Sequence, residues 1–198
     1  MSREALLMIF IKNPVLGQVK TRLATETGDE EALRIYELLL QHTRNVTATI
    51  DTPKLIYYSD FLPDQGLWKG TNHQQALQPG GDLGQRMARA FQQNLKQYEQ
   101  VIIIGGDDPE LQASHLTTAF EQLKTYDVVI GPASDGGYYL LGMSAFYPGL
   151  FQGIAWSTDQ VRAQTLEQLV KAGLSYYLLP EHNDIDTYQD WLSSPWQA

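Results

Sequence analysis

The stretch Val101–Pro109 (VIIIGGDDP) most constrains the fold of this 198-residue chain. Its four consecutive β-branched residues favour a strand buried on both faces, as in the middle of a parallel sheet. Gly105 and Gly106 then let the chain bend, and Asp107 and Asp108 are the first charged residues beyond the strand. In open α/β sheets, ligands bind outside the carboxyl ends of the strands. We therefore expect these two carboxylates at a binding site.

The adjacent acids Asp107 and Asp108 indicate a divalent-cation site, because Mg²⁺ is commonly held by one or two carboxylates together with substrate phosphates. The competing interpretation is that one of them caps the following helix or closes a turn. Asp184 and Asp186 follow the last predicted strand, and a carboxylate there could complete a metal site with Asp107. Alternatively, Asp186 or Thr187 caps a terminal helix.

The order of predicted elements indicates an α/β fold. Strands alternating with helices imply βαβ units and a largely parallel sheet. The length fits one domain over residues 1–198. The predicted strands are Leu6–Ile11, Lys54–Ser59, His73–Gln78, Val101–Ile104, Asp127–Gly131, Gly137–Gly142 and Ser175–Leu179. The predicted helices are Asp29–Thr49, Leu83–Tyr98, Ser114–Thr125, Thr158–Ala172 and Ile185–Leu192, and Lys12–Leu23 is expected as a loop.

The composition excludes several classes of function. A net charge of -9 argues against a general nucleic-acid binder, which needs clustered Lys and Arg. The absence of Cys excludes disulfides, a thiolate nucleophile and a Cys-based zinc site. No apolar run approaches the length of a membrane span, and the run Ala5–Ile11 is interpreted as a first strand instead of a signal peptide. We expect a cytoplasmic protein.

Basic residues gather in the loop after the first strand, where Lys12, Lys20 and Arg22 lie close in sequence and Gly17 lets the backbone turn near a ligand. A phosphate ligand would account for this cluster, since Arg makes bidentate contacts to phosphate oxygens and Lys acts as a point charge. The glycine spacings of a Walker loop and of a dinucleotide fingerprint are missing. The alternative is an ordinary solvated group of surface cations.

Two glycine-rich stretches are further candidates. In QPGGDLGQR, which starts at Gln78, backbone N–H groups before a helix can bind a phosphate or a base edge, although a capped helix after a tight turn is an equal alternative. In GPASDGGYYLLG, an exposed turn can approach a substrate, and it is equally compatible with a β-hairpin. The candidate binding residues in these stretches are Gln78, Gly81, Asp82, Gly84, Asp135, Gly136, Gly137 and Tyr138.

Isolated histidines and tryptophans carry weaker expectations. His182 is expected in a surface loop, because no second His lies at metal-binding spacing. The four tryptophans are candidates for exposed aromatic area in a possible homodimer contact, namely Trp68, Trp156, Trp191 and Trp196.

Together, five motifs resemble those of a bacterial family of nucleotide-diphospho-sugar transferase-like proteins, described as an uncharacterised glycosyltransferase family with the GT-A fold. They cover nearly the whole chain in order: Lys12–Ala24, Gln78–Met87, Ile104–Leu111, Gly131–Gly142 and Asp184–Asp190. The resemblance implies a Rossmann-like three-layer α/β/α sandwich with a mostly parallel central sheet.

The resemblance also assigns roles to individual residues. It implies that Lys20 and Arg22 bind a diphosphate or triphosphate, that Asp107 ligates Mg²⁺ or Mn²⁺, and that Asp186 lies near the metal. The Gln78–Gly84 loop would lie near the nucleotide. The residues Asp135, Gly136, Gly137 and Tyr138 would lie near the acceptor.

These parts predict a metal-dependent transferase that acts on a nucleotide or nucleotide-sugar donor and a small-molecule acceptor. Sugar transferases with this fold usually carry D-x-D, whereas this chain has G-D-D-P, and an acid with proline two residues later resembles nucleotidyltransferases. Glycosyl transfer and nucleotidyl transfer both remain open at this point. The alternative from another class is a catalytically inactive nucleotide-binding or partner-binding protein with the same fold.

Overall fold

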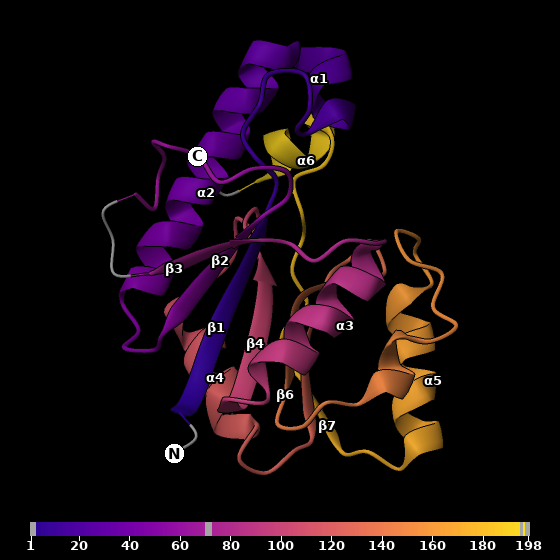
Figure 1. Ribbon diagram of the computed structural model, residues 1–198. Coiled ribbons are helices and arrows are strands. Elements are labelled where there is room, and N and C mark those ends of the chain that lie inside the picture. Colours follow the sequence, from indigo (N-terminus) through magenta and orange to yellow (C-terminus); the bar gives the residue numbers. More distant parts are fainter. Residues whose placement is uncertain (1–2, 70–72, 195, 197–198) are drawn as a thin grey trace.

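The computed structural model describes residues 3–69, 73–194 and 196, and these form helices around one seven-stranded sheet (Figure 1). The strands are β1 (Arg3–Ile11), β2 (Lys54–Tyr58), β3 (Gln74–Leu77), β4 (Tyr98–Gly105), β5 (Val128–Pro132), β6 (Tyr138–Met143) and β7 (Tyr176–Leu178). The helices are α1 (Thr21–Thr27), α2 (Asp29–Ala48), α3 (Leu83–Asn94), α4 (Ala113–Gln122), α5 (Val161–Ala172), α6 (Tyr188–Ser193) and the 3₁₀ helix η1 (Pro148–Phe151). No described helix is long and apolar enough to cross a membrane.

The sheet is mostly parallel, with the strand order β3-β2-β1-β4-β6-β5-β7. Strands β3, β2, β1 and β4 are parallel neighbours, and β5 is parallel to β7. Strand β6 is antiparallel to both β4 and β5, and it forms with β5 the hairpin that the sequence allowed. The loops after β1, β4 and β5 therefore meet at one edge of the sheet, where the loop after β7 joins them.

Apolar side chains on both faces of the sheet divide the molecule into three layers. Along β4, Val101 and Ile103 pack in the cluster formed with α3 and α5. In Figure 1, α3 crosses in front of the sheet and α5 stands at its right. Ile102 and Ile104 point the other way, into the cluster formed with α2 and α4. This alternation is the geometric period of a strand. The structure confirms the Rossmann-like α/β/α fold with a mostly parallel central sheet.

A third cluster forms a small lobe beyond the carboxyl edge of the sheet, where α1, the first half of α2 and α6 pack together (Figure 1). Its buried residues include Leu23 from α1, Leu39 from α2 and Trp191 from α6. Ile185, in the connection from β7 to α6, is buried in the same cluster. The N-terminal and C-terminal parts of the chain are thus joined by packing at the edge that carries the candidate residues.

Several local expectations need correction. Helix α1 begins at Thr21, inside the stretch that was expected to be a loop. Neither Asp107 nor Asp108 caps α4, because Gln112 occupies that position with a capping box. Asp82 does cap α3 by accepting from Gln85 N at 2.8 Å. Thr187, one of the two residues considered, caps α6.

The expected surface position of His182 is wrong, because its residue surface is only 3% exposed. Trp68 and Trp191 are also buried, at 1% and 7% exposed. Trp68 packs in the cluster between the sheet and α2, and Trp191 anchors α6, so neither offers a large exposed aromatic face. The homodimer remains a prediction.

We predict that Ile102→Ala lowers the free energy of unfolding by about 2–5 kcal/mol, because it removes a fully buried side chain in the middle of β4 and leaves a cavity. Urea denaturation followed by circular dichroism measures the change. The matched control is Val170→Ala on α5, where the side chain is 69% exposed and little apolar burial is lost. Equal losses for the two variants would contradict the layer assignment.

Candidate active site

The central feature of the candidate site is the ammonium group of Lys20, which lies between two carboxylates. Its Nζ is 2.7 Å from Oδ2 of Asp107, directly after β4, and 3.2 Å from Oδ1 of Asp186, before α6. The Lys20 side chain is 6% exposed, whereas the two carboxylates are 41% and 42% exposed. Three residues that the sequence singled out separately are therefore joined by one cation.

The backbone at Lys20 is strained in a way that serves this contact. Lys20 has a φ of 45°, in the left-handed region, immediately before α1. A non-glycine residue held there costs roughly 1–3 kcal/mol and persists only where the surroundings enforce it. Gly17, with a φ of 73°, turns the loop just before it. The loop and helix together aim the lysine at the end of β4.

The pKa values at the site reflect a competition between burial and neighbouring charges. Burial opposes the charged form of Lys20, but Asp107 and Asp186 outweigh it, so the lysine pKa is raised. Burial likewise opposes ionisation of Asp107, but Lys20 lowers the pKa of that carboxyl below its usual value. For Asp184 the balance is reversed: burial, followed by the charges of Asp107 and Asp135, raises its pKa to about 8, although the charge of Lys20 acts in the opposite direction. Lys20 therefore stabilises the charged form of Asp107 more effectively than that of Asp184.

Two further cations border the same acids. Arg22 Nη1 lies 3.4 Å from Oδ2 of Asp186, and its side chain is 76% exposed. Lys12 is exposed, and its charge contributes to the lowered pKa of Asp107. The backbone of Lys12 is fixed by Tyr36, whose hydroxyl accepts from Lys12 N at 3.0 Å. Lys12, Lys20 and Arg22 thus form one basic group beside the acids, as the sequence predicted.

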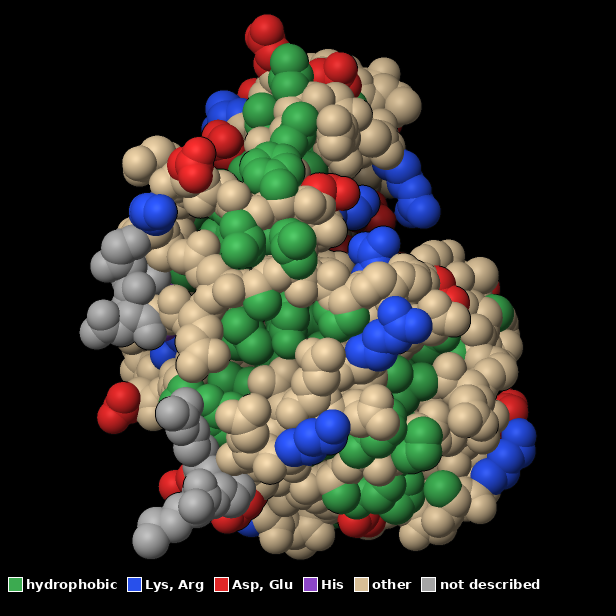
Figure 2. Space-filling model, viewed as in Figure 1, with side chains coloured by type: hydrophobic (Ala, Val, Ile, Leu, Met, Phe, Trp, Pro, Cys, Tyr) green, Lys and Arg blue, Asp and Glu red, His purple; other side chains and the backbone are tan. Residues whose placement is uncertain are grey.

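The surface has a notch at the same edge of the sheet. Figure 2 shows a hollow between the small lobe and the body of the molecule, with Lys and Arg side chains at its mouth and acidic side chains behind them. The notch lies at the carboxyl edge of the sheet seen in Figure 1.

The loop before α3 is a rigid neighbour of the first loop. Gln78 Nε2 donates to the carbonyl oxygen of Ile11 at 3.0 Å, next to Lys12, and Gln78 Oε1 accepts from Arg86 at 3.3 Å. Arg86 Nε also donates to the oxygen of Gly81 at 2.7 Å. Gln78 and Gly81 therefore lie beside the basic loop. Arg86, which the sequence analysis did not select, belongs with them.

Two candidates at the start of α3, Asp82 and Gly84, have structural roles. Asp82 caps α3, as described above. Gly84 is buried against the indole of Trp156, since a Cβ atom there would lie 2.0 Å from Trp156 Nε1. Neither contact brings these side chains to the acids around Lys20, so their role in binding stays a prediction.

The hairpin loop between β5 and β6 approaches the site from the other side. Asp135 is exposed, accepts from Gly137 N at 2.8 Å, and acts electrostatically on Asp184. Gly136 has a φ of 88°, and a Cβ atom there would collide with the carbonyl oxygen of Asp159. Tyr138 turns its hydroxyl into the interior, where burial raises the phenol pKa and Thr165 is its neighbour. Asp135, not Tyr138, is the side chain this loop directs toward the acids.

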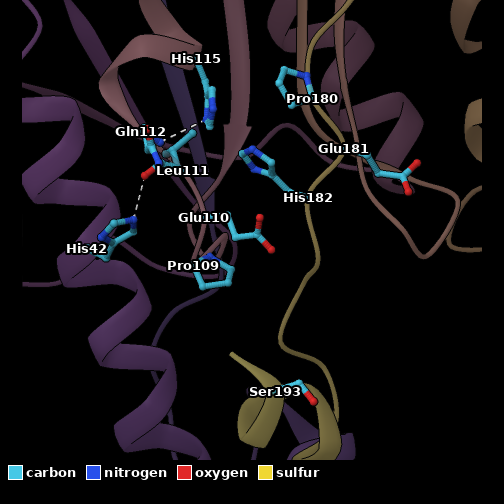
Figure 3. Close-up of a pocket in the computed structure, with 10 residues that line it drawn as sticks. All are labelled: His42, Pro109, Glu110, Leu111, Gln112, His115, Pro180, Glu181, His182 and Ser193. Carbon is cyan, nitrogen blue, oxygen red and sulfur yellow. Dashed lines mark hydrogen bonds between the residues drawn. The ribbon is translucent and has the colours of Figure 1, made fainter. Parts of the chain in front are cut away.

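A buried pair lies directly behind the site, and the sequence analysis missed it. His182 Nδ1 is 2.7 Å from Asp108 Oδ2, and the two side chains are 3% and 4% exposed. His182 also lines a separate pocket of about 640 Å³ between α2, the β4–α4 connection and the segment after β7. Figure 3 shows His182 projecting from that segment toward Glu110 and His115. The pocket lining includes none of the predicted site residues. In the sequence, only the two adjacent acids of GDDP pointed to this pair, because one of them could face the interior.

The carboxylates at the site are suitable ligands for a divalent cation, but they do not form a complete metal-binding cluster. No three His, Asp or Glu side chains of the described chain lie close enough together to hold a metal ion. Lys20, however, already gathers Asp107 and Asp186 on one positive charge, and Asp184 adds a buried carboxyl group on which Asp107 acts electrostatically. Hard oxygen ligands of this type suit Mg²⁺ and Mn²⁺.

Comparison with solved structures identifies relatives of this arrangement. A protein from Desulfovibrio desulfuricans, described as a "putative nucleotide-diphospho-sugar transferase", is 36% identical, with a TM-score of 0.89 over 96% of this chain and 85% of its own. The 4-diphosphocytidyl-2C-methyl-D-erythritol synthase from Anaerococcus prevotii is 9% identical, with a TM-score of 0.62 over 98% of each chain. An inositol-1-phosphate CTP transferase from T. maritima is 13% identical, with a TM-score of 0.57 over 96% of this chain and 91% of its own. The latter two share the fold alone.

Sequence comparison places the chain in a family. Among curated proteins, none matches it. The model of the family described as "Uncharacterized protein conserved in bacteria (DUF2064)" matches residues 42–158, which include β4 and the β5–β6 hairpin. This match and the 36% identity over nearly the whole chain agree with the resemblance seen in the five motifs. The chain belongs to the DUF2064 family and has the fold of nucleotide-diphospho-sugar transferases.

Proposed function

We propose that this protein is a transferase that moves a nucleotidyl group from a nucleoside triphosphate to a small acceptor, with Mg²⁺ or Mn²⁺ as cofactor. The observation that carries the proposal is the Lys20 ammonium shared by Asp107 and Asp186 at the carboxyl edge of the sheet. Phosphates and a divalent cation need this combination of cations and acids within one notch. The shared fold with a protein described as a CTP transferase supports the nucleotidyl version.

We assign the acidic residues to the metal ion and the basic residues to the phosphate groups. Asp107 and Asp186 would hold the metal, with Asp184 beside them, and when bound the metal would neutralise charge on phosphate oxygens. Lys20, Arg22 and Lys12 would bind the remaining phosphate oxygens. In the reaction, an acceptor oxygen forms a bond to the α-phosphorus, and the bond from that phosphorus to the leaving oxygen breaks and releases pyrophosphate. The basic group stabilises the negative charge that develops on those oxygens.

A second candidate is glycosyl transfer, in which an acceptor hydroxyl attacks the sugar carbon and the nucleoside diphosphate leaves. The description of the 36% identical relative as a nucleotide-diphospho-sugar transferase favours it. The same basic group would then stabilise the departing diphosphate.

A thermal-shift screen separates these candidates. We expect nucleoside triphosphates with Mg²⁺ or Mn²⁺ to raise the melting temperature, and EDTA to abolish the rise, because a ligand that binds only the folded state stabilises it by mass action. Stabilisation by nucleotide sugars alone would favour glycosyl transfer. Metal-independent nucleotide binding without product from any acceptor would favour an inactive binding protein. No shift in any condition would contradict the proposal.

Asp107→Asn is expected to abolish binding of Mn²⁺, measured by isothermal titration calorimetry, because the amide removes the negative charge at the proposed metal ligand. Turnover should fall on the order of 10²–10³-fold, by analogy with the loss of one group that stabilises a developing oxyanion. The control is Glu121→Gln, an exposed carboxylate on α4 paired with Lys124. Normal Mn²⁺ binding by the Asp107 variant would remove Asp107 from the metal site.

Lys20→Met separates the metal from the nucleotide. Because a divalent cation would replace Lys20 as the counter-charge of Asp107 and Asp186, we expect this variant to retain Mn²⁺ binding. Affinity for a nucleoside triphosphate should fall roughly 10–100-fold, the value of one charged hydrogen bond of about 1.5–3 kcal/mol. Lys96→Met, an exposed lysine in the turn before β4, is the control. Unchanged nucleotide affinity would contradict a phosphate contact by Lys20.

A further inference from the structure

The buried pair of Asp108 and His182 joins the two segments that carry the proposed metal ligands. Asp108 directly follows Asp107 in the chain, and His182 lies two residues before Asp184 and four before Asp186. The two side chains meet at 2.7 Å between Nδ1 and Oδ2. Since a carboxylate can only accept, the His182 ring carries its proton on Nδ1 and donates it to Asp108.

Both partners are fixed by further contacts, so the bond has a defined geometry. The other oxygen of Asp108 accepts from Glu110 N at 2.9 Å. The backbone of His182 donates to Pro132 O at 3.0 Å and accepts from Ser134 N at 2.9 Å, which ties it to the end of β5. The His182 ring stacks on Tyr139, with centroids 3.9 Å apart and an interplanar angle of 3°. The ring and the carboxylate are thus each held by contacts besides the bond that joins them.

The other links between these segments are weaker or exchangeable. Asn183 donates to Glu110 from its backbone and side chain at 3.2 and 3.4 Å, but this contact is exposed to solvent. Lys20 bridges Asp107 and Asp186, but a divalent cation would replace it there. Ile185 packs into the small lobe instead of onto the β4–α4 connection. Among the described residues, the Asp108–His182 hydrogen bond is therefore a buried link between the two segments that does not depend on Lys20. The His182 ring also contacts His115 at the start of α4, with centroids 4.5 Å apart.

We propose that Asp108 and His182 are positioning residues that hold Asp107 at a fixed distance from the Asp184–Asp186 segment and thereby set the affinity of the divalent-cation site. This inference rests on the proposed function. Outer-shell partners of metal ligands act in this way, and their loss typically costs 10–100-fold in metal affinity.

Two substitutions of His182 separate the hydrogen bond from the ring stacking. His182→Phe keeps a ring against Tyr139 but cannot donate to Asp108, whereas His182→Asn keeps an N–H donor near the position of Nδ1 but loses the ring. Both should lower the melting temperature. We expect only His182→Phe to weaken Mn²⁺ binding, by roughly 10–100-fold in calorimetric titration of the full chain. His182→Asn should bind Mn²⁺ nearly as tightly as the wild type.

A double variant guards against unfolding of His182→Phe, which leaves a buried oxygen of Asp108 without its donor. Asp108→Leu together with His182→Phe replaces both partners by apolar groups, a change that can be nearly neutral for stability. We expect this variant to fold and to show the same loss of Mn²⁺ affinity as His182→Phe.

The outcomes are distinguishable. Wild-type affinity in His182→Phe and in the double variant would overturn the positioning role and leave the proposed function intact. Affinity that falls in parallel with melting temperature in all three variants, His182→Asn included, would also overturn it, because a general packing role predicts that result. If the wild type itself binds no Mn²⁺, with or without a nucleotide, the proposed function and this inference both fail.

Discussion

The burial of β4 on both faces is the constraint on which the rest of the structure depends. Because Val101, Ile102, Ile103 and Ile104 must all leave water, helices are required on each side of the sheet, and β4 must have a strand on each edge. Because β4 is central, the residues that follow it lie at the carboxyl edge of the sheet. Asp107 and Asp108 leave that edge in different directions, toward Lys20 and toward His182.

The adjacent acids Asp107 and Asp108 differ in exposure and in partner. Asp107 is partly exposed and meets the ammonium group of Lys20, which a divalent cation would displace in the proposed function. Asp108 is enclosed and meets the ring of His182, which stacks on Tyr139. In the proposed function, Asp107 would respond to the ligand while the Asp108–His182 pair would support it.

The sequence predicts the fold well, and it places Lys20 and Asp107 in loops that follow two strands of one parallel sheet. Buried strands can be recognised from their apolar composition. Because the carboxyl ends of parallel strands lie at one edge of the sheet, the loops that carry Lys20 and Asp107 lie at the same edge. The contact between Lys20 and Asp186 was less accessible, because it depends on α1 starting directly after a left-handed residue. Neither the start of α1 nor the left-handed conformation of Lys20 can be recognised from a pattern of hydrophobic residues.

The burial of His182 could not be predicted from its neighbours in the chain, because it depends on the hairpin of β5 and β6 and on Tyr139 within it. The orientation of Tyr138 has the same origin. A shift of one residue in a strand exchanges the two faces, so the alternation of Tyr138 and Tyr139 decides which hydroxyl enters which layer. These contacts reflect register, and the composition of the stretch GYYLLG is the same in either register.

The antiparallel placement of β6 also bears on the order in which the molecule assembles. Strands β5 and β6 are neighbours in sequence and pair through a short loop, and hairpins of this kind form within about 1–10 μs. The pairing of β1 with β4 joins segments separated by a long intervening chain, and such contacts form more slowly. We therefore expect the loop with Asp135 to form locally and early, and the contact of Lys20 with Asp107 to follow the closing of the sheet.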